Sequence, residues 1–266
     1  MAPIRISGPA QLKDAYRKVM DNIARAAERS GRRPSDVALV AVTKTASPDQ
    51  IRTLVEMGHA DLGENRVQHL QQRVATLDEF LARRRTLGTP SARGEKSDAV
   101  PAKVRWHMIG HLQRNKVKQV VPLVHLIHSV DSLRLAEELH NLGARGERTI
   151  EILIQVNISG EASKTGVAAP AVIHLAEQID TMMHLKLRGL MTMAPHTGNP
   201  EEARPIFARA AELFHEIRSA KVGGPEFNIL SMGMTEDYEV AIQEGANIVR
   251  VGRAIFGDEE QPEIPG

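Results

Sequence analysis

The stretch that decides the fold is Val-Ala-Leu-Val-Ala-Val-Thr-Lys at residues 37–44. It is an apolar run with several β-branched residues, and Thr-Ala-Ser-Pro at 45–48 follows it as a turn and a helix start. A strand that is apolar at successive positions is buried on both faces, which is typical of parallel α/β sheets. Such a strand delivers its last side chain, here Lys44, to the carboxyl edge of the sheet, where α/β folds keep their sites.

The same alternation of apolar strands and amphipathic helices continues along the chain. We predict strands at residues 37–43, 60–63, 104–109, 126–129, 150–158, 185–191, 227–230 and 247–251. We predict helices at residues 11–29, 48–57, 67–83, 112–121, 132–141 (ending at Gly143), 171–179, 200–219 and 237–244. Eight strand–helix units after one extra N-terminal helix favour a single α/β barrel of the (β/α)8 TIM type. An open doubly wound sheet is the alternative, but no G-x-G-x-x-G opens the first helix after a strand.

One barrel domain is therefore expected over residues 1–266, with the N-terminal helix within residues 1–33. Residues 84–103 are polar, contain Gly, Pro and Ser, and have few large apolar side chains, so we expect a flexible loop insertion there. Because strands and helices alternate again beyond it, this segment does not divide the chain into domains.

The composition excludes several classes of function. The formal net charge is +1, which is too small an excess for a general nucleic-acid or anionic-membrane surface. Cysteine is absent, so disulfides, thiolate metal sites and a cysteine nucleophile are excluded. The first residues lack an apolar signal core and no segment approaches the length of a membrane span, so we expect a cytoplasmic protein.

Lys44 is the first candidate functional residue. A lysine that is partly dehydrated at a strand end can lose its proton and attack an aldehyde. Many lysines at such positions simply reach water, so Lys44 alone would be weak support for a site. In a closed barrel, however, the eighth strand lies beside the first, and the loops after strands seven and eight usually bind phosphate.

The material for a phosphate site is present in those two loops. Ser-Met-Gly-Met-Thr at 231–235 opens a helix and offers hydroxyl and backbone N–H groups, although a plain helix N-cap would also explain it. Gly252 lets a ligand approach the backbone closely. Arg250 shares strand parity with Gly252 and would face the barrel interior, where a buried guanidinium needs a partner. A nucleophilic lysine beside a phosphate cradle suits a phosphorylated aldehyde.

Eight segments spread over residues 37–257 together resemble one known family. They are Val-Thr-Lys-Thr at 42–45, Gly-Glu-Asn-Arg-Val-Gln at 63–68, Trp-His-Met-Ile-Gly-His-Leu-Gln-Arg-Asn-Lys at 106–116, Gln-Val-Asn-Ile-Ser at 155–159, Ser-Lys-Thr-Gly at 163–166, Leu-Arg-Gly-Leu-Met at 187–191, Leu-Ser-Met-Gly-Met-Thr at 230–235 and Val-Arg-Val-Gly-Arg-Ala-Ile-Phe-Gly at 249–257. The sequence is similar to the pyridoxal phosphate homeostasis protein family, single-domain relatives of the alanine racemase N-terminal barrel. One such match would be weak, but the set is highly specific.

The resemblance implies pyridoxal 5′-phosphate (PLP) as the cofactor, with a role for ten residues. It implies that Lys44 forms the internal aldimine, that Arg250 faces the pyridine nitrogen and that Asn65 lies beside the ring. It implies that the phosphate is held by Ser231, Thr235, Gly252 and Arg253. It further implies that the pocket is lined by His107, Asn157 and Met191.

The sequence departs from the family pattern at two positions. Arg253 stands where many relatives carry a small hydroxyl residue, so its backbone N–H and guanidinium would have to replace a hydroxyl contact. His111 stands where proline is frequent, and His107 with His111 is an unfavourable pair for zinc because the two straddle a strand end. Lys164 is a candidate second aldehyde-accepting lysine, with a plain surface role as the alternative.

The resemblance favours a carrier of PLP in intracellular vitamin B6 homeostasis over an enzyme. About nine residues follow Gly257, so we expect no second domain to supply an opposing acid or base, and neither Tyr16 nor Tyr238 is expected to face Lys44. The alternatives are a weak PLP-dependent amino-acid racemase or lyase, and a Schiff-base aldolase acting on sugar phosphates. Apo forms of PLP-dependent enzymes are the candidate partners, no metal is expected, and the resemblance implies a monomer.

Overall fold

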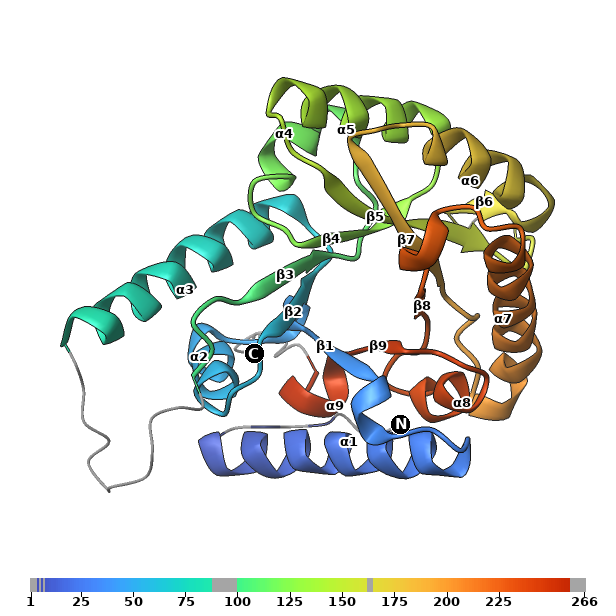
Figure 1. Cartoon of the computed structure of the whole chain (residues 1–266). Coiled ribbons are helices and arrows are strands. Elements are labelled where there is room, and N and C mark those ends of the chain that lie inside the picture. Colours follow the sequence, from blue (N-terminus) through green and yellow to red (C-terminus); the bar gives the residue numbers. More distant parts are fainter. Residues whose placement is uncertain (1–3, 5, 7, 88–99, 162–164, 259–266) are drawn as a thin grey trace, which may run out of the picture.

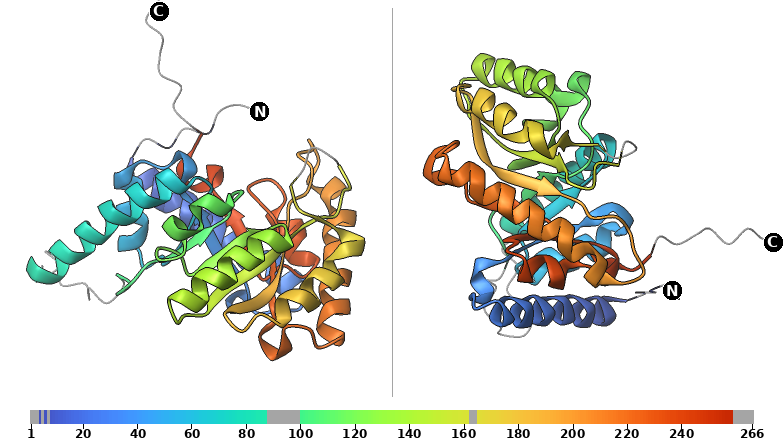
Figure 2. Two further views of the ribbon diagram at one scale, coloured as in Figure 1. Left: turned by 90° about the horizontal axis from the view of Figure 1, so that it is seen from above. Right: turned by 90° about the vertical axis from the view of Figure 1, so that its right-hand side faces the viewer.

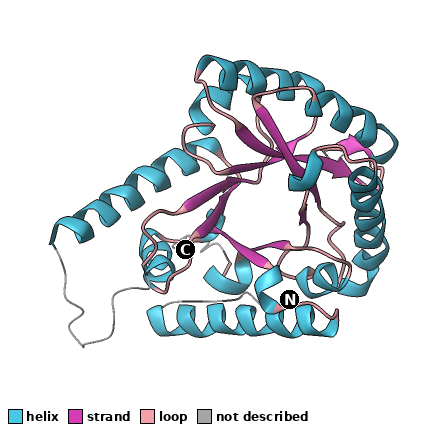
Figure 3. Cartoon of the chain, viewed as in Figure 1, coloured by secondary structure: helices cyan, strands magenta, loops and turns pink. Residues whose placement is uncertain are grey.

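The computed structural model describes residues 4, 6, 8–87, 100–161 and 165–258. Its centre is a ring of parallel strands, and helices form a layer outside that ring (Figure 1; Figure 3). Most of the predicted loop insertion at 84–103, and the candidate Lys164, lie outside the described residues. No helix in the described ranges combines the length and the apolar character needed to cross a membrane.

In this part of the chain, eight parallel strands close into a barrel. They are β1 (Ala38–Val42), β2 (Asp61–Glu64), β3 (Arg105–Met108), β4 (Leu126–Val130), β5 (Ile150–Asn157), β7 (Leu185–Thr192), β8 (Ile229–Ser231) and β9 (Ile248–Val251). The first and last strands pair directly, with Ala41 opposite Val251, and the ring is completed by pairing between β4 and β5. The predicted barrel is confirmed, and every predicted strand overlaps an observed one.

Each barrel strand is followed by a helix of the outer layer. These helices are α2 (Pro48–Glu56), α3 (Val67–Leu87), α4 (Val117–Val120), α5 (Leu133–Arg145), α6 (Val172–Asp180), α7 (Arg204–Ser219), α8 (Tyr238–Gln243) and α9 (Arg253–Phe256). Their apolar sides pack on the outward-facing residues of the strands, among them Leu39, Leu62 and Ile152. This cluster is the main hydrophobic core. Burial of such side chains is the dominant favourable term in folding.

The predicted N-terminal helix is α1 (Pro9–Arg29), and it completes the outer layer. It lies against α8 and α9, as Figure 1 and the right-hand view of Figure 2 show. Leu12, Val19 and Ile23 form its buried side. The last barrel unit contributes only the one-turn helix α9, and α1 packs on α8 and α9 as an additional helix of the outer layer.

Five details differ from the sequence-based prediction. Residues 84–87, which were expected to begin the loop insertion, form the end of helix α3. The helix expected at 112–121 is the 3₁₀ turn Arg114–Lys116 followed by α4 alone. Helix α5 runs two residues past Gly143, to Arg145, and the glycine allows a close approach there, because a Cβ would lie 2.9 Å from the Arg148 carbonyl oxygen. The strand β6 (Val167–Ala168), beside β5, and the helix α9 were not predicted, because two and four residues are too few to show a period.

The barrel interior contains an apolar cluster, formed by Val40, Leu126, Leu153, Met191 and Ile248. These side chains alternate along their strands with the residues that face the helices. The same interior also holds buried polar side chains from β3, β4, β8 and β9. The cavity described next opens at the carboxyl ends of the strands.

Candidate functional site

A cavity of about 390 Å³ opens where the strands end, and most of the loops that follow them contribute to its wall. Volumes of this order are typical of small-molecule sites, and the carboxyl end of the strands is where barrels of this type carry them. Six of the ten residues predicted from the sequence line it: Lys44, Asn65, Thr235, Arg250, Gly252 and Arg253.

Lys44 lies in a one-turn 3₁₀ segment, Thr43–Thr45, between the end of β1 and the start of α2. The segment is short because α2 begins at once. Ser47 is its N-cap, with its hydroxyl accepting from the Gln50 N–H at 3.2 Å while the Gln50 side chain accepts from the Ser47 N–H at 2.9 Å. Such a capping box satisfies two donors that a helix start leaves free. The lysine is therefore held on a tight turn rather than on a long loop.

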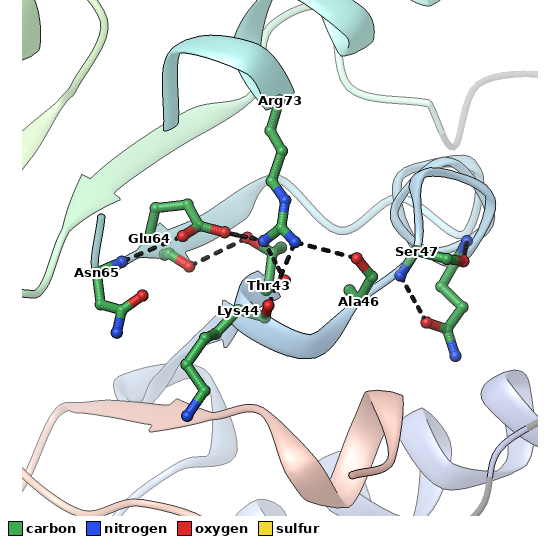
Figure 4. Close-up of polar contacts among 9 residues, drawn as sticks. Thr43, Lys44, Ala46, Ser47, Glu64, Asn65 and Arg73 are labelled. Carbon is green, nitrogen blue, oxygen red and sulfur yellow. Dashed lines mark hydrogen bonds and ion pairs between the residues drawn. The ribbon is translucent and has the colours of Figure 1, made fainter. Parts of the chain in front are cut away.

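A buried ion pair fixes this turn from behind. Glu64, at the end of β2, is fully buried and pairs with Arg73 of α3. The Arg73 guanidinium also donates to the backbone carbonyls of Thr43, Lys44 (3.3 Å) and Ala46 (3.1 Å), and burial lowers the pKa of Arg73 from its usual value. In Figure 4 the Lys44 side chain points away from this pair. The ion pair thus holds the backbone of the turn and does not engage the Lys44 amine.

Asn65 directly follows Glu64 and lines the cavity. Its backbone N–H donates to the Glu64 carboxylate at 3.2 Å. Its side-chain oxygen Oδ1 is buried, and none of the described residues donates a hydrogen bond to it. A buried acceptor without a donor is costly, so this atom is suited to a donor carried by a ligand.

The opposite wall is formed by the loop after β8 and the start of α9. Thr235 lies in a turn closed by Asp237, whose Oδ1 accepts from the Met234 N–H at 2.6 Å, and burial raises the pKa of Asp237. Gly252 precedes α9, whose first N–H groups lack intrahelical acceptors and suit an anion. A Cβ at Gly252 would lie 3.0 Å from the Val42 carbonyl oxygen. The glycine therefore also allows β9 to end close beside the Lys44 turn.

The Arg253 guanidinium is engaged at the cavity mouth. Its Nη2 donates to Glu236 at 2.6 Å, and His196 Nδ1 lies 2.8 Å from the other oxygen of the same carboxylate. The Arg253 side chain is 45% exposed and that of Glu236 is 24% exposed, so water weakens this pair. The Arg253 guanidinium thus lies at the cavity wall, where it already forms an ion pair with Glu236.

Arg250 has its side chain inside the barrel, as its strand parity predicted. Nη2 donates to the Thr192 carbonyl at 2.9 Å and Nη1 donates to the Ser231 hydroxyl at 2.6 Å. Burial lowers the pKa of Arg250 to about 10, with the nearby Asp237 carboxylate opposing that shift. A value of that size keeps the guanidinium charged at neutral pH, so the cavity has a fixed cation at its floor.

Four predicted residues do not line the cavity, each for a structural reason. Ser231 has its hydroxyl between Arg250 and His128 inside the barrel. His107 is buried lower on β3, between Asp61 and His128. Asn157 closes a turn after β5 through bonds to Ser159, Gly160 and Glu161. Met191 belongs to the apolar cluster of the barrel interior.

Known proteins match this chain over most of its length. A family model for the alanine racemase N-terminal domain matches residues 16–260. The pyridoxal phosphate homeostasis protein of Aquifex aeolicus is 36% identical over 245 residues, which is 91% of this chain and 95% of that protein. This chain belongs to the pyridoxal phosphate homeostasis protein family.

Two solved structures of PipY from Synechococcus elongatus are similar to this chain over most of its length. PipY of Synechococcus elongatus without PLP is 30% identical, with a TM-score of 0.73 over 90% of this chain and 99% of that chain. PipY with PLP bound is also 30% identical, with a TM-score of 0.71 over 88% of this chain and all of that chain (100%). The family and the fold are thus established together.

Several residues that line the cavity were not predicted from the sequence. They include Gln155 on β5, which donates to Thr165 at 2.8 Å, and the mouth residues His111, His196, Glu236 and Asp237. Gln155 and Asn157 lie on the same face of one strand, so the alternation of side chains along the strand predicts that both face the barrel interior. Only the depth of the cavity along the strand distinguishes them. The ion pair of Glu64 and Arg73 could have been predicted in part from the sequence. A carboxylate at the end of a buried strand needs a partner, but the sequence does not say which residue that partner is.

Proposed function

We propose that this chain binds PLP in the described cavity and stores or delivers it in intracellular vitamin B6 homeostasis, with Lys44 as the attachment residue. The observation that carries the proposal is that a lysine amine, a phosphate-suited helix start and a buried arginine line one cavity of about 390 Å³. Membership of the homeostasis family and the description of PipY with PLP bound support it.

The cavity residues fit this cofactor chemically. When bound, PLP supplies an aldehyde for attachment and a conjugated ring that withdraws electrons. The Lys44 amine would hold the aldehyde carbon, and the loop of Thr235 and the backbone around Gly252 and Arg253 would hold the phosphate. The Arg250 guanidinium has only donors and no proton to give up, so it would leave the ring nitrogen unprotonated. Asn65 Oδ1 is the open acceptor beside them.

We infer a carrier rather than an efficient enzyme. The tyrosines are engaged away from the cavity, because the hydroxyl of Tyr16 lies 3.3 Å from His59 and that of Tyr238 accepts from Asn22 at 2.9 Å. We further infer a cytoplasmic monomer that delivers PLP to apo forms of PLP-dependent enzymes. The mass of the protein in solution would test whether it is a monomer.

The alternative is a weak amino-acid racemase or lyase, and one observation favours it. His111 and His196 line the cavity and offer imidazole groups besides the Lys44 amine. The alternative predicts that the α-proton of an amino acid exchanges with heavy water, and that Lys44→Ala abolishes the exchange. Absence of exchange in the PLP-loaded wild type would favour the carrier.

The decisive test is an absorption spectrum of the purified protein with and without added PLP. Wild type should show a visible band, and Lys44→Ala should lose it because no other cavity lysine is found among the described residues. Lys13→Ala is the matched control, since Lys13 is exposed on α1 and should keep the band. A wild type that stays colourless with PLP would overturn the proposal.

A further inference from the structure

A chain of buried polar side chains runs from the floor of the cavity through the barrel. Arg250 Nη1 lies 2.6 Å from Ser231 Oγ, and Ser231 Oγ lies 3.0 Å from His128 Nδ1. His128 Nε2 lies 3.0 Å from His107 Nδ1, and His107 Nε2 lies 3.1 Å from Asp61 Oδ1. Five strands contribute, and β4 and β8 are connected across the barrel interior rather than as neighbours in the sheet.

The lower end of the chain reaches the opposite mouth of the barrel. Asp61 and Arg105 are the first residues of β2 and β3, and Arg105 Nε donates to Asp61 Oδ1 at 2.6 Å. Burial alone would raise the pKa of Asp61, but hydrogen bonds from His107 and Arg105 outweigh it and hold the pKa well below its usual range. Asp61 is therefore ionised and acts only as an acceptor.

The two ends determine where the hydrogens lie. Arg250 can only donate and Asp61 can only accept, while Ser231 and His128 are fully buried. Burial holds the pKa of His128 well below its usual value, so this imidazole is neutral. Asp61 accepts from His107 Nε2, and all of the contacts along the chain are satisfied when both rings carry hydrogen on Nε2. The Ser231 hydroxyl then donates to His128 Nδ1.

We propose that Ser231 and His128 are positioning residues that fix Arg250 at the cavity floor. Because the Ser231 hydrogen is directed to His128, the hydroxyl oxygen presents only lone pairs to Arg250. The guanidinium is then held at two nitrogens, by Ser231 and by the Thr192 carbonyl. This inference rests on the proposed function, in which Arg250 faces the ring nitrogen of PLP, and it adds that the Ser231 side chain serves Arg250 and not the phosphate.

The hydrogen arrangement is testable in the protein without PLP. Nitrogen-15 NMR of the imidazole rings should show hydrogen on Nε2 of both His107 and His128, and none on Nδ1 of His128, at neutral pH. Hydrogen on Nδ1 of His128, or a charged His128 ring, would reverse the donor order toward Ser231 and overturn the proposal. This measurement uses the wild type, so it holds even if a variant does not fold.

The positioning role is testable with a matched pair of serine variants. Ser231 and Ser129 are both fully buried strand serines, but Ser129 Oγ has no hydrogen-bond partner within the described ranges. Ser231→Ala should weaken PLP binding about tenfold, since it removes a hydrogen bond to a charged group. It should also shift the absorption maximum of bound PLP. Ser129→Ala should change neither quantity, and Ser231→Thr, which keeps the hydroxyl, should restore both.

The outcomes separate this inference from the proposed function. A wild type that binds PLP, with a Ser231→Ala variant of equal affinity and equal absorption maximum, would overturn the positioning role alone. Equal effects of the two alanine variants would also overturn it. A wild type that does not bind PLP would overturn the proposed function, while the NMR result would still decide the hydrogen arrangement.

Discussion

Two ion pairs flank the cavity, and they differ in their access to water. Glu64 and Arg73, behind the Lys44 turn, have side chains that are 0% and 18% exposed. Glu236 and Arg253, at the mouth, are 24% and 45% exposed. A desolvated carboxylate must keep its partner, whereas an exposed pair contributes little and is screened by salt. The first pair therefore builds the site, and the second leaves an arginine that an anionic ligand can recruit.

The buried pair is also connected to more of the structure. The Thr43 hydroxyl donates to Glu64, and Arg73 donates to three backbone carbonyls of the Lys44 turn and the residues after it. The end of β2, the turn after β1 and helix α3 thus meet at one carboxylate (Figure 4). Removing any member leaves polar groups behind that water cannot easily reach.

The largest effect is expected for Glu64→Ala. It leaves the Arg73 guanidinium without its buried partner, and we expect unfolding free energy to fall by about 3–5 kcal/mol. Glu236→Ala, the matched change at the mouth, should cost within about 1 kcal/mol. Chemical denaturation of the two variants measures both. A similar small loss for both would show that burial does not distinguish the pairs.

The second prediction concerns pH and the buried His128. In the unfolded chain a histidine binds a proton below about pH 6.5. Burial keeps His128 neutral in the folded protein, so the unfolded state binds more protons and stability falls as pH decreases. One such histidine contributes a loss of about 2 kcal/mol between pH 7 and pH 5. Urea unfolding at both pH values measures the loss of unfolding free energy. The loss should be smaller in His128→Gln than in wild type by about 2 kcal/mol. Equal losses in the two proteins would show that His128 is not held neutral by burial.

A third, smaller effect is expected for Thr43→Val. The change keeps the side-chain shape but removes the hydroxyl that bonds Glu64 and the Gly63 carbonyl (3.2 Å). We expect a loss of about 1–2 kcal/mol in thermal or chemical unfolding, because the buried carboxylate loses one donor but keeps Arg73. A loss as large as that of Glu64→Ala would mean that the hydroxyl, and not the ion pair, holds the turn.

The smallest effect is expected for Glu236→Gln. It removes a negative charge beside the proposed phosphate position and frees Arg253, so PLP should bind about threefold more tightly at low salt. The gain should shrink as salt is added. Glu212→Gln, in an exposed ion pair with Arg209 on α7, is the control and should leave affinity unchanged. A loss of affinity in Glu236→Gln would show that the mouth pair positions the ligand.

The strand–helix alternation and the residues at strand ends were predictable from the sequence. Most of the barrel strands are apolar runs, so their positions follow from hydrophobicity, although β2 (Asp-Leu-Gly-Glu) has only one large apolar residue. The side chain of Arg250 faces inward because side chains alternate along a strand. Lys44 and Gly252 were predictable because they lie two residues and one residue beyond the ends of such strands. The helices longer than about two turns were predictable from their period.

Depth within the barrel was decided by the tertiary structure. Alternation says which face a residue occupies but not how far along the strand the cavity reaches. The family resemblance implied Asn157, and Gln155, two residues earlier on the same face, lines the cavity wall. Between β5 and β7 the register shifts after Ile152, where Leu187 and then Gly189 are the partners of successive residues. This irregularity changes which residues of β7 face the barrel interior. Beyond it the side chain of Met191 points inward and belongs to the apolar cluster.

Partners distant in sequence were also decided only by the fold. Arg73 meets the Lys44 turn, and Ser231 meets His128, across 29 and 103 residues of chain. The sequence by itself determined a closed parallel barrel with a lysine and an arginine at its carboxyl end. Closure of the barrel decided which buried donor meets which acceptor, because pairing across the interior depends on where whole strands lie and not on local sequence.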